Sequence, residues 1–249
     1  MSHSVVGRQR RTTKKRRPQS DAPGLTRDAI VDAALKIIDT ADLESFSMRN
    51  LAKELGVYPT AIYWHIPSRN SVIAEVISRV LGDVVPPDHP DWKVWLKQLF
   101  RNYRLSIRRH PNVAPLIGVQ LVSNASVDLN MIESILRTLV QAGFAEKDVL
   151  SIYNAVIATM VGFTTQEFAM VPKEEADDWA SAMQRVTATV DNRRYPILAK
   201  NIDAFANKAF ILRWQNGAVS PLDSGFDAFI EAIVDGLDVR LQNSRDATD

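Results

Sequence analysis

Apolar residues recur at helical spacing along nearly the whole chain. Ile30, Ala33, Ala34, Ile37 and Ile38, for example, fall three or four residues apart and predict one buried face of a helix. No long stretch alternates apolar and polar residues, as a half-buried strand would, and proline and glycine fall mainly between the periodic segments. The sequence therefore predicts an all-α protein.

Capping residues predict where the helices begin and end. Thr26 and Ser47 are good N-caps, Gly56 suits a left-handed C-terminal position, and Pro59 suits a first helical turn. After a first helix from Thr26, we expect helices at about 47–55, 58–65, 68–84, 91–109, 125–142, 146–170, 174–192, 196–208 and 223–242.

The net charge of +1 conceals an asymmetry between the N-terminus and the rest of the chain. Residues 1–25 hold seven Lys or Arg and one Asp, so they carry 7 − 1 = +6, and the other residues sum to −5. A basic arm on a mildly acidic body is typical of an electrostatic tether to a polyanion. The alternative interpretation is a disordered tail that only keeps the protein soluble. We expect residues 1–25 to be disordered in either case.

Several classes of protein are disfavoured by composition and motif. The chain has no cysteine, which excludes disulfides, and its N-terminus lacks the apolar core of a signal peptide. Apolar runs such as 155–163 are short of the roughly 20 residues of a membrane span. No nucleophile elbow, phosphate loop or zinc-protease motif occurs, and the four histidines are scattered. We expect a soluble cytoplasmic protein that is not an enzyme and has no metal site or cofactor.

Two short predicted helices, 47–55 and 58–65, are separated only by Gly56-Val57. This is the spacing of a helix-turn-helix, in which the second helix enters the major groove of DNA. We place the motif at about 47–66, after one amphipathic helix and before another.

The segment 26–84 resembles the N-terminal domain of the tetracycline-repressor (TetR) family, above all in SMRNLAKELGV and AIYWHIPSR. Residues 85–249 resemble the family's body more loosely, through WKVWLKQLFRNYRLSIRR, LVQAGF and the run ending in Glu167. The resemblance implies a three-helix DNA-binding domain at 26–84 and a larger α-helical effector-binding and dimerisation domain at 85–249. It also implies a ligand-responsive regulator, most simply a repressor, that binds a palindromic double-stranded operator as a homodimer and is released by a small molecule.

By position, the resemblance assigns roles to individual residues of the motif. Tyr63 and Arg69 match phosphate contacts, and Arg49 matches an arginine that reads guanine. The full set of predicted DNA-binding residues is Ser47, Arg49, Tyr58, Pro59, Thr60, Ala61, Tyr63, Trp64, His65 and Arg69. Alternatives remain for some of them: Tyr63 and Trp64 as core, and Arg49 as a solvated charge. We expect His65 to be a packing or phosphate-facing residue rather than a metal ligand. Tyr58-Pro59 departs from the family pattern and is poor in donors, which favours contact with thymine methyl groups.

The predicted effector is apolar or aromatic rather than a tetracycline–magnesium complex. Where tetracycline-binding members hold a magnesium-binding histidine and a pocket asparagine, this chain has Leu116 and Leu99. Most ligand pockets are largely apolar with a few polar groups. The candidate lining residues are Tyr103, Leu116, Met131, Asn154, Phe163, Gln166 and Glu167, and each of them has core or surface as its alternative.

The resemblance also implies that the helices predicted at 146–170 and 223–242 pair with those of a second copy in a four-helix bundle. The apolar candidates are Ala155, Ala158, Met160, Gly162, Phe226, Phe229, Ile230, Ile233 and Leu237; burial within one chain is the alternative. Two rival functions stay open: a DNA-binding or architectural protein without an effector and, more remotely, an enzyme.

Overall fold

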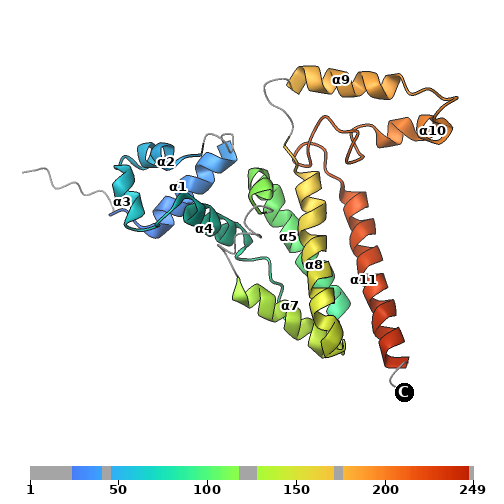
Figure 1. The fold of residues 1–249 in the computed structure, drawn as a ribbon, viewed down its shortest axis with the longest axis horizontal. Coiled ribbons are helices and arrows are strands. Elements are labelled where there is room, and N and C mark those ends of the chain that lie inside the picture. The colour runs from blue at the N-terminus through green and yellow to red at the C-terminus, as the bar shows by residue number, and fades with distance from the viewer. Residues whose placement is uncertain (1–23, 41–45, 118–127, 171–175, 247–249) are drawn as a thin grey trace, which may run out of the picture.

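In a computed structural model, residues 24–40, 46–117, 128–170 and 176–246 are described. These residues form helices joined by turns and loops, without a strand, so the predicted all-α class is confirmed. The predictions for the basic arm lie outside the described residues, apart from Gly24 and Leu25. Figure 1 shows a small helical head, which begins with α1, and a larger helical body beside it.

The head consists of four helices. They are α1 (Arg27–Thr40), α2 (Met48–Leu55), α3 (Pro59–Tyr63) and α4 (Arg69–Leu81). α1 packs against α4 and α2, and α2 packs against α3. Ile30, Leu51, Ile62 and Val72 are fully buried between these helices. The apolar periodicity of the sequence therefore marks the inner face of the head correctly.

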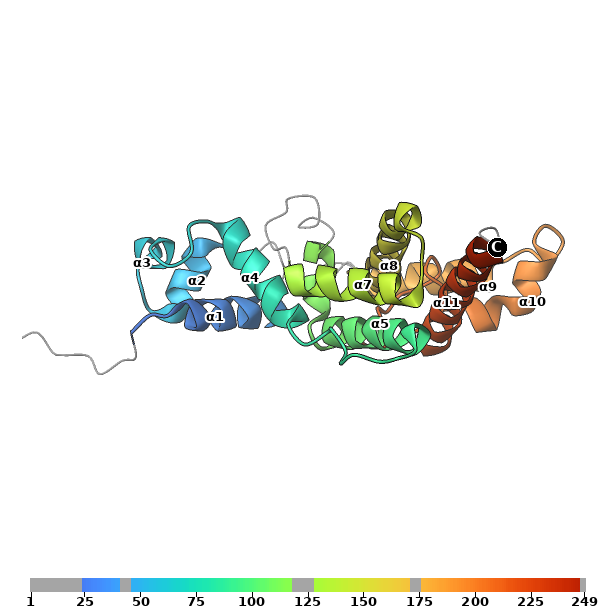
Figure 2. The ribbon, with the colours of Figure 1, turned by 90° about the horizontal axis from the view of Figure 1, so that it is seen from below.

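The body is built on the long helices α5 (Trp92–Arg109), α7 (Leu129–Ala142), α8 (Glu146–Glu167) and α11 (Asp223–Asp246). The short 3-10 helix η2 (Pro111–Val113) follows α5. α9 (Ala176–Ala188) and α10 (Pro196–Phe205) lie beyond one end of α8 and α11 (Figures 1 and 2). The molecule is elongated, with the head at one end and α9 and α10 at the other (Figure 2).

Local capping accounts for several helix boundaries. The Thr26 hydroxyl accepts from the Ala29 amide at 3.1 Å, as predicted for the start of α1. α7 begins at residue 129 rather than at the predicted 125, because the carboxylate of Asp128 caps it by accepting from two following amides at 3.0 and 3.1 Å. The predicted ends at 170, 192 and 208 were also wrong, since α8, α9 and α10 end at residues 167, 188 and 205. α11 instead runs beyond the predicted residue 242.

A buried ion pair joins three helices of the body. Glu167, at the end of α8, has no exposed surface. Its carboxylate accepts from Arg104 Nε at 2.7 Å and Nη2 at 2.6 Å, and from the Leu222 amide at 2.8 Å. Arg104 belongs to α5, and its guanidinium also lies 2.8 Å from the exposed Asp223 at the start of α11. Two parallel donors to one carboxylate fix direction as well as distance.

Four further ion pairs among the described residues connect α5 with α11 along their length. Their members are Lys93 with Asp238, Lys97 with Glu231, Arg101 with Asp227, and Arg108 with Asp223. Each pair is partly exposed, so its individual contribution to stability is small. Together these pairs form only when α5 and α11 lie in one position along each other's length.

α8 is long and apolar enough to cross a membrane, judged by length and composition alone. Its contacts give a different reason for its apolar character, since it packs against α5, α7 and α11. Its inner residues, including Ile152, Val156 and Met160, belong to the core.

Removal of the Glu167 carboxylate is expected to destabilise the body strongly. Glu167→Ala removes the bidentate partner of the buried Arg104 guanidinium and leaves it only the exposed Asp223. Breaking a buried pair in this way typically costs about 3–5 kcal/mol. Urea denaturation followed by circular dichroism measures the loss. Glu54→Ala is the matched control, because it breaks the exposed pair with Lys36 and should leave the midpoint nearly unchanged. Equal midpoints for the two variants would contradict the structural role of the buried pair.

Candidate nucleic-acid interface

Local sequence chemistry shapes the turn between α2 and α3. The Ser47 hydroxyl accepts from the Asn50 amide at 3.2 Å and so caps α2, as predicted. Gly56 has φ of 66°, a left-handed conformation that favours glycine, and Pro59 occupies the first turn of α3. The helix-turn-helix spacing predicted from Gly56-Val57 is therefore present. α3 is shorter than the predicted 58–65. Tyr58 is extended, as a residue before proline prefers, so the helix begins at Pro59, and Trp64 and His65 form a turn after its end at Tyr63.

The three aromatic side chains of the motif's second helix and its flanks lie on the surface of the head. Tyr58 is 83% exposed, Trp64 89% and Tyr63 47%, whereas the neighbouring Ile62 and Ile66 are fully buried. Ile62 anchors α3 on the head and leaves the three rings outside. The alternative interpretation of Tyr63 and Trp64 as core residues was therefore wrong. Such large exposed rings on one short segment are typical of a contact surface.

The charged residues of the head are arranged so that two arginines stay outside its ion pairs. Arg79 pairs with Asp28 and Asp32, Arg27 with Glu75, and Lys36 with Glu54. Within the part of the chain that the structure describes, no ion pair uses Arg49 or Arg69, and both are exposed. Four acidic groups of the head, Asp28, Asp32, Glu54 and Glu75, are thus neutralised within it, although its net charge is negative.

Arg69 is held in place at the start of α4. Its Nε donates to the Phe46 carbonyl at 3.1 Å, and its guanidinium carbon lies 5.3 Å from the centre of the Phe46 ring. The side chain is therefore oriented and still exposed. An oriented arginine suits a phosphate better than a freely moving one, since less rotamer entropy is lost on binding.

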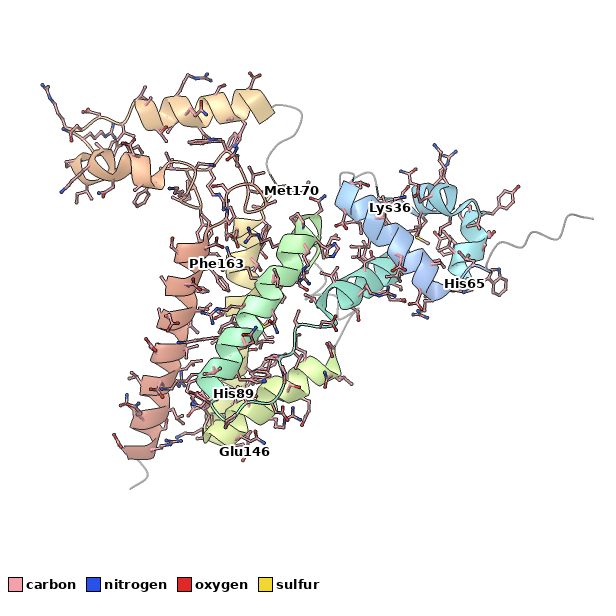
Figure 3. All side chains as sticks on the ribbon, turned by 180° about the vertical axis from the view of Figure 1, so that it is seen from behind. Lys36, His65, His89, Glu146, Phe163 and Met170 are labelled. Carbon is pink, nitrogen blue, oxygen red and sulfur yellow. The ribbon has the colours of Figure 1, made fainter. Side chains whose placement is uncertain are left out.

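The other predicted DNA-binding residues lie on the same end of the head. Pro59, Thr60 and Ala61 form the first turn of α3, and Ala61 is half-buried. Figure 3 places the exposed His65 at the end of the head that is remote from the body. The ten predicted residues thus come from the start of α2, from α3 and the turn after it, and from the start of α4.

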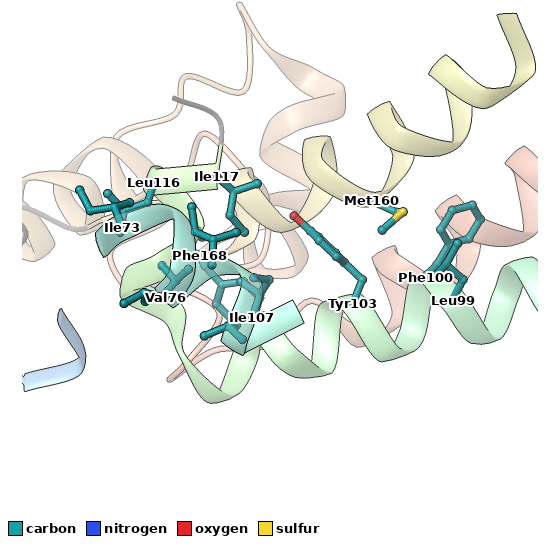
Figure 4. Close-up of a cluster of buried hydrophobic side chains, with 14 of the residues drawn as sticks. Ile73, Val76, Leu99, Phe100, Tyr103, Ile107, Leu116, Ile117, Met160 and Phe168 are labelled. Carbon is teal, nitrogen blue, oxygen red and sulfur yellow. The ribbon is translucent and has the colours of Figure 1, made fainter. Parts of the chain in front are cut away.

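None of the cavities described here, which are lined by residues that the structure describes, brings the seven predicted effector residues together. Tyr103 and Leu116 are core residues, shown with Met160 and Phe168 in Figure 4. Burial raises the pKa of the Tyr103 phenol, whose hydroxyl is hydrogen-bonded to Thr164. Asn154 is exposed on α8, and Met131 is half-buried on α7. The spacing of these residues along the sequence did not indicate that they face different sides of the body.

Glu167 was predicted to line an effector pocket. In the structure its carboxylate is paired with Arg104 and the Leu222 amide, and with Gln166 it borders a small cavity of about 130 Å³. Arg104 could not be predicted as its partner, because it lies 63 residues away and no local pattern links the two.

Phe163 does line a large cavity. A space of about 840 Å³ lies between α8, α11 and the segment 204–210, with Phe163, Phe210 and Phe229 in its wall. The ring of Phe163 is 5.1 Å from that of Phe210 and 5.6 Å from that of Phe229, measured between centres. A second apolar hollow, of about 690 Å³, lies between α7 and α8. Both volumes are in the range of small-molecule sites.

The fold and this surface define a class of protein: a helix-turn-helix DNA-binding head on a larger helical body. Comparison with known families agrees. The pattern described as "Bacterial regulatory proteins, tetR family" matches residues 30–76, and "Tetracyclin repressor-like, C-terminal domain" matches residues 86–239. The chain belongs to the TetR family. It is therefore a DNA-binding, ligand-responsive transcriptional regulator and not an enzyme.

Individual relatives are moderately similar. An HTH-type transcriptional regulator of Saccharopolyspora erythraea is 29% identical over 184 residues, which span 73% of this chain and 77% of the relative. The class D tetracycline repressor protein of Escherichia coli is 21% identical over 225 residues, with 87% and 91% covered. The crystal structure of BioQ with its double-stranded DNA operator is 29% identical, covers 58% of this chain and 88% of its own, and superposes with a TM-score of 0.53.

Substitutions at Ser47 are expected to separate helix capping from DNA contact. Ser47→Ala removes the cap of α2 and should cost about 1 kcal/mol of stability. Ser47→Asp keeps a capping oxygen and so should keep the stability, but its carboxylate should repel phosphate and weaken DNA binding. Thermal melts and fluorescence anisotropy with duplex DNA measure the two effects. Unchanged DNA affinity of Ser47→Asp would show that this position does not face the backbone of DNA.

Proposed function

We propose that the protein is a repressor that binds a palindromic operator as a homodimer and that leaves it when a small apolar or aromatic molecule binds the body. The observation that best supports this proposal is the exposed surface of the helix-turn-helix and the start of α4. It carries the rings of Tyr58, Tyr63 and Trp64 and the two arginines Arg49 and Arg69, all of them exposed. In this proposal α3 lies in the major groove. Arg49 reads a guanine edge, while Arg69 and Tyr63 hold phosphates.

The proposed domain division follows the two bodies of helices. Residues 26–84 form the DNA-binding domain, and residues 85–249 carry the effector and the second copy. A regulator that reads chromosomal DNA works in the cytoplasm of a bacterial cell, and we infer that location for this protein. The proposal that this protein represses rather than activates transcription rests on relatives such as the repressor DrrR1 of Streptomyces coeruleorubidus. DrrR1 is 23% identical over 246 residues, which span 94% of this chain and 84% of DrrR1.

The outer faces of α8 and α11 support the homodimer. Ala158 and Gly162 of α8 are exposed, as are Ala228, Ala232 and Gly236 of α11. Small residues at this spacing allow two helix pairs to approach closely. Four of the residues expected to form the bundle are instead buried within one chain: Met160, Phe226, Ile230 and Leu237. The second copy would therefore pack on the small residues and on the half-buried Phe229 and Ile233.

The cavity beside Phe163 supports an aromatic effector. Three phenylalanine rings form its wall, and aromatic ligands gain from edge and offset stacking as well as from burial. Gly162 and Ala228 belong both to this cavity and to the proposed dimer face. An effector bound there would therefore touch the region that sets the spacing of the two heads.

Two arginine variants test the proposed roles at the DNA. Arg49→Ala should relax specificity at one position per half-site, at a cost of about 1–3 kcal/mol for a bidentate contact. Arg69→Ala should weaken binding to all sequences alike, because a phosphate carries no sequence information. Selection of binding sites from random DNA, followed by anisotropy titrations, measures both. Thermal melts control for the hydrogen bond that Arg69 makes within the head. Indistinguishable site preferences of the two variants would refute these assignments.

The basic arm is proposed to follow the phosphate backbone. Residues 1–22 contain seven cations and one acid, and the head that follows has net negative charge. Each phosphate neutralised should add about 0.9 to the magnitude of the slope of log affinity against log salt. Deletion of residues 1–22 should flatten that slope by several units and leave sequence preference mostly intact. Equal slopes with and without the arm would mean that it does not touch DNA, and lost preference for flanking A·T pairs would indicate minor-groove contact instead.

A further inference from the structure

The last turn of α1 is completed by a side chain of the body. The final carbonyl groups of a helix have no partner inside that helix. In α1, the carbonyls of Ile38 and Asp39 accept from the side-chain amide of Asn112, at 2.8 and 3.2 Å. Asn112 belongs to η2, which directly follows α5. One amide of the body therefore terminates the first helix of the head.

The end of α4 is completed in the same way. The hydroxyl of Ser106, on α5, donates to the Val80 carbonyl in the last turn of α4 at 2.7 Å. Just beyond that helix, the side-chain amide of Asn102 donates to the Val84 carbonyl at 3.1 Å. Gly82, at the C-cap of α4, has φ of −58° and so does not form the left-handed ending that often satisfies these carbonyls.

A side-chain pair adds to the contact at α1. His110 Nδ1 lies 2.9 Å from Asp39 Oδ2, and each side chain is less than one-third exposed. His110 is the residue at which α5 ends and η2 begins. At this junction Ser106 of α5 holds the end of α4. His110 and Asn112, at and just after the end of α5, hold the end of α1.

We propose that Asn112, Ser106 and His110 are positioning residues that fix the direction of the DNA-binding head on the body. Their partners at the head include backbone carbonyls, which move only when the helix itself moves. A displacement of the C-terminal end of α5 and of η2 must therefore carry the ends of α1 and α4 with it. Because His65, one of the predicted DNA-binding residues, lies at the remote end of the head (Figure 3), a small rotation at this junction becomes a larger displacement there.

The test measures the head–body distance within one chain. The protein has no cysteine, so Lys53→Cys on α2 and Glu133→Cys on α7, both exposed positions, accept one spin label each. Labelled chains are diluted with unlabelled protein, so that each measured pair belongs to a single chain. Pulsed electron paramagnetic resonance should give one narrow distance for the parent. With Asn112→Ala and Ser106→Ala together, that single distance should be lost to a broad distribution.

Matched controls remove the same chemistry elsewhere. Asn201→Ala deletes an amide that donates to the Ile197 carbonyl, and Ser151→Ala deletes a hydroxyl that donates to the Asp148 carbonyl, both outside the junction. The control pair should keep the narrow distance. If the double alanine variant fails to fold, Asn112→Asp removes the donor at nearly unchanged size. A distribution as narrow as that of the controls, in a folded variant, would overturn the proposal.

DNA affinity is the second measurement, and it rests on the proposed homodimer. It shows whether Asn112 and Ser106 position the head or contact DNA directly. Two duplexes, a palindrome selected from random DNA by the parent protein and its half-site, are titrated with each variant. Affinity of the double variant for the palindrome should fall about tenfold, within the usual range of couplings between sites, while half-site affinity stays unchanged. An equal loss on both duplexes, or no loss on the palindrome, would overturn the proposal. If the parent itself showed no preference for the palindrome, the proposed homodimer would fail instead.

Discussion

The carboxylate of Glu167 is buried where α5, α8 and the start of α11 meet, and the body's architecture depends on its pairing. Burial of an isolated charge is costly, so this group is stable in the core only with Arg104 and the Leu222 amide beside it. Gly217 approaches so closely that a β-carbon there would lie 2.4 Å from Glu167 Cγ. The Gly217 amide donates to the Glu167 carbonyl at 2.7 Å. The chain must therefore return to this point before α11 can begin.

The same point connects the body with the head. Arg104 is held by Glu167 near the C-terminal end of α5, and Ser106, two residues later, completes the end of α4. A change in the packing of α8 or α11 can therefore reach the head through a single helix. The large cavity beside Phe163 lies between α8 and α11. An effector in that cavity would act on the two helices that hold Arg104 in place.

Features that depend on neighbouring residues could be predicted from the sequence. Ser47 caps α2, Gly56 takes a left-handed conformation and Pro59 opens α3, because each of these effects needs only a few adjacent residues. The exposure of Tyr63 and Trp64 was open at that stage, since aromatic residues serve both cores and surfaces. The burial of the adjacent Ile62 and Ile66 leaves the rings outside.

Features that depend on distant residues could not be predicted in this way. The role of Glu167 depends on Arg104 and Leu222, which lie 63 and 55 residues away. α8 carries apolar residues on most of its faces. Periodicity alone therefore did not separate Met160, which is buried within the chain, from Ala158, which is exposed. The polar side chains that bond to the last carbonyls of α1 and α4 could not be predicted. Nothing in the neighbouring sequence distinguishes Ser106 or Asn112 from a serine or asparagine that faces water.

In the proposed homodimer the body presents two identical heads to one operator. Sedimentation velocity of the full chain on a duplex selected from random DNA measures how many chains bind. The selected duplex should be palindromic, and it should saturate with two chains, one head on each half-site. Saturation of the palindrome by a single chain, or a selected site without two-fold symmetry, would contradict the proposed homodimer.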